Sequence, residues 1–122
     1  MKESILKAKS YQFALDSVLI CKTLFKNHEF ILSKQFLRSS TSVGANIREA
    51  QYAQSSRDFI HKLSISLKEC DETLYWLELL KDSDYLTKSE FEMLFNQAVE
   101  LKKMLSSSII TAKKKLNIST TS

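Results

Sequence analysis

The sequence predicts an all-α protein that folds as an up-down-up-down antiparallel four-helix bundle. Apolar residues recur at spacings of three and four along four segments, which is the period of an amphipathic helix. No segment alternates as a strand does, and the chain holds one glycine and no proline, which favours long helices joined by short connections. A chain of 122 residues can form a core of its own, so we expect one domain over residues 1–122.

The two C-terminal segments show the helical period most clearly. Their apolar positions are Ile60, Leu63, Leu67, Cys70, Leu74 and Leu77 in the first, and Phe91, Leu94, Ala98, Leu101, Leu105, Ser108 and Ala112 in the second. Thr87 with Glu90 three residues later forms a capping box, which predicts the start of the last helix. We expect residues 115–122 to fray.

Two further helices are predicted in the N-terminal half. The first is expected to end near residues 26–29, and Ser33 is a candidate N-cap for the second. The expected buried faces are Tyr11, Ala14, Leu15, Val18, Cys21 and Phe25 on the first helix, and Phe36, Leu37, Ser40, Val43, Gly44 and Ile47 on the second. Ser55 or Ser56 should cap the third helix, with Asp58 favouring its positive N-terminus.

Gly44 is the single glycine, and it falls inside the second predicted helix. A glycine in the middle of a helix costs about 0.5–1 kcal/mol relative to alanine. Its neighbours Ser40, Ser42 and Ala45 are also small. We therefore expect the backbone of another helix to approach closely at Gly44.

The composition is that of a globular protein, with 43% hydrophobic and 26% charged residues. No apolar run approaches the roughly 18 residues of a membrane span, and the N-terminus is too polar for a signal peptide, so we expect a cytoplasmic protein. Cys21 and Cys70 lie in apolar stripes, which favours reduced core thiols over a disulfide or a metal site.

Motifs for catalysis are missing from the sequence. A di-metal bundle site needs a Glu-x-x-His pair on each of two helices, and the chain offers only His28, in a connection, and His61, three residues after Asp58. A glycine-rich phosphate loop is impossible with one glycine, and no serine or cysteine triad pattern occurs. We expect a protein that is not an enzyme and uses no cofactor or metal.

Charge is distributed unevenly along the chain. Lys and Arg minus Asp and Glu gives +6 for residues 1–68, −7 for 69–100 and +5 for 101–122. The proposed topology brings basic residues of all four helices to one end of the bundle. They are Lys2, Lys7, Lys9, Arg48, Arg57, Lys62, Lys113, Lys114 and Lys115. Such an end suits phosphate backbones and predicts salt-sensitive binding of RNA or DNA without sequence preference, whereas a solvated helix end is the alternative for Lys113–Lys115.

Asn46 and Glu49 lie three residues apart beside Gly44. They are interpreted either as an ordinary solvated face or inter-helix hydrogen bond, or as a polar contact that sets register between helices or subunits. The third helix also carries apolar residues beyond its seam, which predicts an apolar surface and self-association. They are Phe59, Ile65, Trp76, Leu79 and Leu80.

Residues 39–80 resemble the four-helix-bundle family of 23S rRNA intervening-sequence proteins, which also includes the accessory variability proteins of diversity-generating retroelements. The motifs that carry the resemblance are Ser42-Val43-Gly44-Ala45-Asn46-Ile47 with Glu49, then Ser56 with Asp58-Phe59, and then Leu74-Tyr75-Trp76-Leu77. Weaker similarity at Tyr11, Phe13, Ala14 and Gln35 extends it over most of the chain.

The resemblance implies a bacterial cytoplasmic protein and a homopentameric barrel around a central pore. For the accessory variability proteins it implies binding to nucleic acid and to a reverse transcriptase through basic surface. Carried onto this chain, it implies packing or subunit-contact roles for Gly44, Asn46 and Glu49, and an interface or core role for Trp76.

The residues and the resemblance together lead to one main hypothesis. The protein is a cyclic homo-oligomer that binds RNA or DNA weakly through its basic end, as an accessory to a process associated with rRNA or a reverse transcriptase. The alternative is a protein-interaction scaffold whose basic end is incidental. A third interpretation, a small-molecule or metal site in the core, needs polar groups that the apolar seams do not offer.

Overall fold

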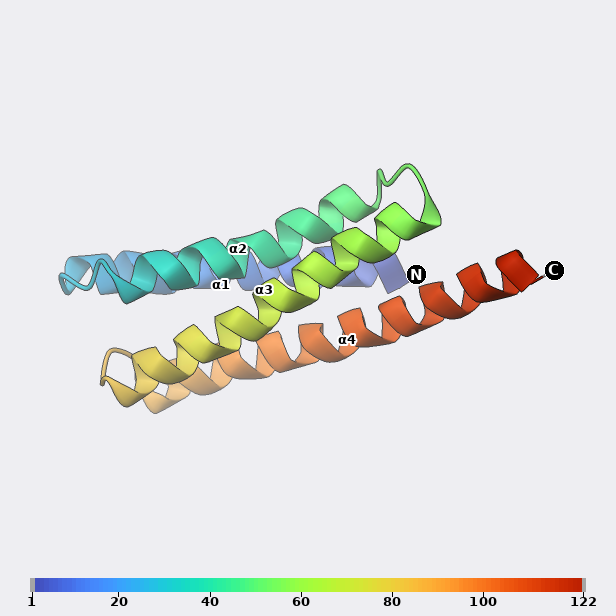
Figure 1. Ribbon diagram of the computed structural model, residues 1–122. Helices are drawn as coiled ribbons and strands as arrows, with labels where there is room; N and C mark the ends of the chain where they lie inside the picture. Colours follow the sequence, from blue (N-terminus) through green and yellow to red (C-terminus); the bar gives the residue numbers. More distant parts are fainter. Residues whose placement is uncertain (1, 122) are drawn as a thin grey trace.

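Four α-helices make up the described part of the computed structural model, which comprises the backbone of residues 2–121 and the side chains of residues 5–117. They are α1 (Lys2–Lys26), α2 (Leu32–Ala50), α3 (Ser56–Asp82) and α4 (Lys88–Thr121). Each helix packs against the next, and α4 packs against α1, whereas the diagonal pairs do not approach within the described residues. Both termini lie at the same end (Figure 1). The predicted up-down-up-down four-helix bundle is thus confirmed.

The last helix runs further than the sequence pattern alone indicates. α4 extends to Thr121, so most of the segment 115–122 is helical. The expected fraying of this segment stays a prediction, and Ser122 lies outside the described residues.

Two connections turn without glycine or proline. His28 and Asp84 adopt the left-handed conformation, with φ of 64° and 65°. In each case the next residue donates its N–H to a carbonyl five residues back, Glu29 to Leu24 and Tyr85 to Leu80, both at 2.9 Å. This is the Schellman ending of a helix, and histidine and aspartate are among the few residue types other than glycine that tolerate it.

Side chains cap the last two helices as the sequence predicts. The Ser55 hydroxyl accepts the Asp58 N–H at 3.1 Å and thereby decides between Ser55 and Ser56 as the cap of α3. At α4 the Glu90 N–H donates to the Thr87 hydroxyl at 3.1 Å, and the Thr87 N–H donates to the Glu90 carboxylate at 2.9 Å. The capping box is therefore confirmed.

The N-cap predicted at Ser33 is wrong. α2 begins at Leu32 and has Ile31 at its N-cap position without a side-chain cap, so Ser33 is already helical and buried. The carboxylate of Glu29 takes over the capping function by accepting the Ser33 N–H at 2.7 Å. The Ser33 hydroxyl instead donates to the Glu29 carbonyl oxygen, also at 2.7 Å.

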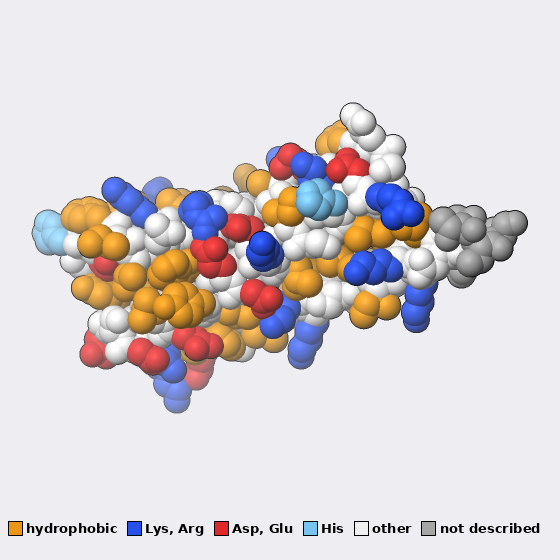
Figure 2. Space-filling view, viewed as in Figure 1, with side chains coloured by type: hydrophobic (Ala, Val, Ile, Leu, Met, Phe, Trp, Pro, Cys, Tyr) orange, Lys and Arg blue, Asp and Glu red, His pale blue; other side chains and the backbone are white. Residues whose placement is uncertain are grey.

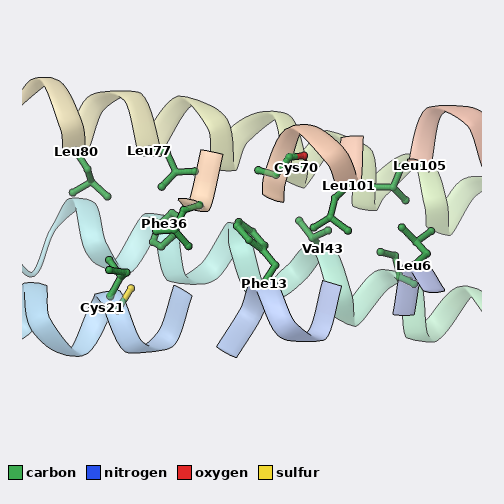
Figure 3. Close-up of a cluster of buried hydrophobic side chains, with 14 of the residues drawn as sticks. Leu6, Phe13, Cys21, Phe36, Val43, Cys70, Leu77, Leu80, Leu101 and Leu105 are labelled. Carbon is green, nitrogen blue, oxygen red and sulfur yellow. Dashed lines mark hydrogen bonds between the residues drawn. The ribbon is translucent and has the colours of Figure 1, made fainter. Parts of the chain in front are cut away.

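The core is built from all four helices, whose apolar side chains meet along the bundle axis (Figure 3). The seams predicted for the second, third and fourth helices supply most of it, with several of their residues only partly buried. Leu80, expected on the surface, is fully buried, because it faces inward one turn beyond Leu77.

The buried face predicted for α1 is partly wrong. Tyr11 and Leu15 are 54% and 44% exposed, whereas the buried face runs through Leu6, Phe13, Cys21 and Leu24 together with two serines. Ser10 and Ser17 can be buried because their hydroxyls donate to the carbonyls of Lys7 and Phe13. A search for apolar residues alone passes over such positions.

Both cysteines are free, buried thiols. Cys70 donates to the Ala98 carbonyl oxygen at 3.2 Å and Cys21 to that of Ser33 at 3.6 Å. Burial raises the pKa of each thiol to about 12, so both stay protonated at neutral pH. They are core groups rather than reactive ones.

Candidate nucleic-acid interface

The eight predicted basic residues lie at the end of the bundle that carries both termini. Lys7 and Lys9 are in the first turns of α1, Arg48 is near the end of α2, Arg57 and Lys62 are at the start of α3, and Lys113–Lys115 are in the C-terminal part of α4. Most of the acidic side chains visible in Figure 2 lie over the other half of the molecule. The ninth cation, Lys2, has a side chain outside the described residues.

Two of these cations are engaged by acidic residues. Lys9 lies 3.1 Å from a Glu100 carboxylate oxygen, and Lys62 lies 3.4 Å from one of Glu49. The Arg48 guanidinium lies over the Tyr11 ring, 5.7 Å from its centroid. Within the described side chains, six of the eight cations, Lys7, Arg48, Arg57 and Lys113–Lys115, have no acidic oxygen within ion-pair distance. These six carry the uncompensated charge of the basic end.

An open cleft of about 800 Å³ lies between the α2–α3 connection and the C-terminal half of α4. Its lining is apolar and hydroxyl-bearing with a single cation, and comprises Ala50, Gln51, Ala53, Ser55, Ser56, Phe59, Ser108, Thr111, Ala112 and Lys115. No carboxylate belongs to it.

Two shallower grooves take up other basic residues. Arg57, His61 and Lys113 line a groove of about 470 Å³ between α3 and α4. Lys7 and Arg48 line another of about 380 Å³ between α1 and α2. The cations therefore surround the end of the bundle instead of forming one flat patch.

The predicted close approach at Gly44 is confirmed. A Cβ atom placed there would lie 3.3 Å from the Ser10 hydroxyl oxygen and 3.4 Å from the Ser10 carbonyl oxygen. The neighbouring helix is therefore α1, and its backbone takes the space that a side chain would need.

Asn46 and Glu49 make different kinds of contact. The Asn46 amide donates to the Ser42 carbonyl oxygen of its own helix at 2.9 Å, whereas exposed Glu49 pairs with Lys62 across α2 and α3. Within this chain only Glu49 thus makes the inter-helix contact that was considered for both.

Trp76 and Phe59 are each half-buried against the core. The Trp76 indole N–H donates to Glu72 at 2.9 Å, and the ring meets Tyr75 edge-on at 5.0 Å. The hydrogen bonds from Trp76 and Arg38 lower the pKa of the Glu72 carboxyl, so this network is ionised at neutral pH. Hydrophobic side chains gather over the C-terminal half of α3 in Figure 2.

A second apolar surface was not predicted. It lies on α1, whose outward face carries Ile5, Tyr11, Leu15 and Leu19, each between 44% and 59% exposed. Tyr11 also borders a groove of about 410 Å³ between α1 and α2, whose lining includes Gly44 and Ala45. The sequence signal was present, since α1 is apolar on more than one side, but Tyr11 and Leu15 were assigned to the core.

The described residues offer neither a metal site nor a membrane-spanning helix. No group of three or more His, Cys, Asp or Glu side chains within the described residues is placed to hold a metal ion. No described helix combines the length and the hydropathy needed to cross a bilayer.

Comparison with known proteins supports the resemblance to the 23S rRNA intervening-sequence proteins. Residues 2–107 match the family described as 23S rRNA-intervening sequence protein. The chain belongs to this family. No protein with a curated description matches it.

A solved structure has the same fold. It is the 1.70 Å crystal structure of a protein with unknown function from the S23 ribosomal protein family of Bacteroides thetaiotaomicron VPI-5482. The two chains are 51% identical, with a TM-score of 0.88 over 89% of this chain and 98% of the other. The family match ends at residue 107, so Lys113–Lys115 and all four α4 residues that line the cleft lie beyond it.

The cleft itself was missed by the sequence analysis. Phe59 and Lys115 were singled out separately, as a subunit contact and as a phosphate contact, but Ala53, Ser108, Thr111 and Ala112 were not connected with them. A signal was available, because residues 106–112 are small or hydroxyl-bearing apart from Ile109 and Ile110. Small side chains leave room beside a helix.

Proposed function

We propose that this protein is a non-enzymatic, cyclic homo-oligomer, a pentamer by its resemblance, that binds the phosphate backbone of RNA or DNA through its basic end. The observation that carries the proposal is the set of six uncompensated cations there, Lys7, Arg48, Arg57 and Lys113–Lys115. Phosphate contacts supply affinity without sequence preference and make it salt-dependent.

Membership of the 23S rRNA-intervening sequence protein family favours a role as an accessory to an rRNA-associated process. A role beside a reverse transcriptase is the second form of the same proposal, since it rests on the resemblance to the accessory variability proteins. Either process would take place in the cytoplasm.

Self-association is supported by the outward face of α1. Four large apolar side chains exposed along one helix make a surface that is generally covered by a partner in soluble proteins. In a cyclic assembly all subunits point the same way, so their basic ends would form one ring and strengthen the local potential.

The alternative function is a protein-interaction scaffold. It is favoured by the exposed Tyr75 and half-buried Trp76 on α3, which lie at a distance from the basic end and offer a second apolar contact surface. A protein partner held by such contacts would bind with little dependence on salt.

A salt series with a charge-matched control tests the proposal. Binding of fluorescent RNA and DNA duplexes is measured for the wild type, for Lys113/Lys114/Lys115→Ala and for Lys22/Lys26/Lys34→Ala, which removes three exposed lysines from the opposite half. We expect the first variant to lower the salt slope by about 1 for each lysine that contacts a phosphate, and the second to leave it unchanged.

The oligomer mass of all three proteins is measured alongside. Equal slopes for the two triple variants would contradict binding through the basic end. Absence of wild-type binding even at low salt would replace the proposal with the scaffold.

A further inference from the structure

We propose that the cleft beside Phe59 binds an unpaired base of a single-stranded nucleic acid, with the Phe59 ring as the stacking surface and Lys115 near the adjacent phosphate. The inference rests on the proposed function and extends it, because it names the form of nucleic acid that the basic end prefers.

The cleft has room for a nucleobase together with its sugar and phosphate, and its lining suits one. Its volume of about 800 Å³ lies in the range of about 300–1,000 Å³ typical of small-molecule sites. Ala50, Ala53 and Ala112 present apolar surface, while Ser108, Thr111 and Gln51 bring hydroxyl and amide groups. A base has two apolar faces and a polar edge, so both kinds of lining have a counterpart on it.

Phe59 is fixed at the place where the cleft meets the core. The same side chain lines the cleft and a void of about 10 Å³ that it shares with Leu6, Ile47 and Leu63. A ring held by the core on one part of its surface and bordering an open cleft on another is a preorganised platform. Stacking on such a ring tolerates any sequence, because every base has a π face.

The charge around the cleft suits the backbone on either side of a bound base. Lys115 lines the cleft, and Arg57 with Lys113 lines the neighbouring groove between α3 and α4. Neither lining contains a carboxylate. Asp58 is held by the Gln54 N–H at 3.2 Å, and residues 101–122 hold five lysines and no acidic residue.

A duplex cannot use this cleft without cost. Its bases are stacked on both faces, and one must leave the stack before it reaches Phe59, which costs a few kcal/mol. Single strands meet no such barrier. The cleft therefore predicts a preference for single strands that lysines at a helix end alone would not produce.

The test compares single strands of about ten nucleotides carrying 2-aminopurine with the matching duplex, in RNA and DNA versions. Phe59→Leu removes the ring and keeps an apolar side chain, Ala112→Leu fills the cleft and keeps the ring, and Phe91→Leu is a control with a half-buried phenylalanine at the opposite end. We expect the first two variants to weaken single-strand binding about 5- to 150-fold and to remove the change in 2-aminopurine fluorescence that binding to the wild type produces. The control and all duplex affinities should stay at wild-type values.

The failure of this inference can be told apart from that of the proposed function. Salt-dependent wild-type binding that Phe59→Leu and Ala112→Leu leave unchanged would overturn the base site and keep the backbone contacts. An equal loss of affinity for single strand and duplex would also overturn the base site, since the two substitutions would then have weakened binding only by disturbing the fold. If the wild type binds neither form, both proposals fall. If the base site is supported, the affinities of the RNA and DNA single strands show which of the two nucleic acids the cleft prefers.

Discussion

At the scale of single residues, Gly44 shows how one missing side chain sets the distance between two helices. We expect Gly44→Val to lower the free energy of unfolding by about 1–3 kcal/mol, because the added atoms overlap with Ser10 of α1. Ala45→Val at the exposed neighbouring position is the control and should cost only about 0.7 kcal/mol, the helix-propensity difference. Urea unfolding at matched protein concentration measures both, and equal losses would contradict the close approach.

The candidate site could be predicted from the sequence only residue by residue. The basic positions could be predicted from topology and charge. In an up-down-up-down bundle it is known which helix ends lie together, and this is enough to place the basic residues at one end. The cleft could not be predicted in this way. It depends on how far α4 lies from the α2–α3 connection, which is set by the packing of whole helices, and its Ala, Ser and Thr lining has no pattern that differs from an ordinary helix surface.

At the scale of helices, the period of apolar residues predicted four elements, but it did not predict every buried face. α2, α3 and α4 each have a seam that could be read directly. In α1, Ser10 and Ser17 lie in the buried stripe, while Tyr11, Leu15 and Leu19 lie outward. Hydroxyls that donate to their own helix backbone make serine compatible with burial. The sequence of α1 alone therefore does not show which of its two faces is buried, because the exposed face is also apolar.

The start of α3 gives a prediction at this scale. Ser55→Ala removes the hydroxyl that accepts the Asp58 N–H, and we expect a loss of about 1 kcal/mol in the free energy of unfolding. Ser56→Ala changes an exposed serine one residue later and should stay within about 0.5 kcal/mol of the wild type. Thermal or urea unfolding distinguishes the two variants, and a larger loss for Ser56→Ala would mean that the helix begins one residue later.

At the scale of the whole molecule, the bundle combines a basic end with apolar surface along its side. Residues 101–122 sum to +5 and residues 69–100 to −7, so neighbouring stretches of the chain place opposite charge in different parts of the bundle. An assembly in which subunits stand side by side would bring like ends together. The apolar outward face of α1 would supply the contact energy that opposes this repulsion.

That reasoning predicts that the outward face of α1 controls assembly. Leu15→Lys places a charge in the middle of the apolar surface, and we expect it to reduce the mass measured by light scattering from a multiple of the 14.1 kDa chain toward that of the single chain. Met93→Lys on α4 is the matched control, because Met93 is 46% exposed and Leu15 44%. Circular dichroism should be unchanged in both, since neither side chain belongs to the core. Because the proposed assembly would bring basic ends together, Leu15→Lys should also weaken the proposed RNA binding at low salt. An unchanged mass would show that α1 does not hold subunits together.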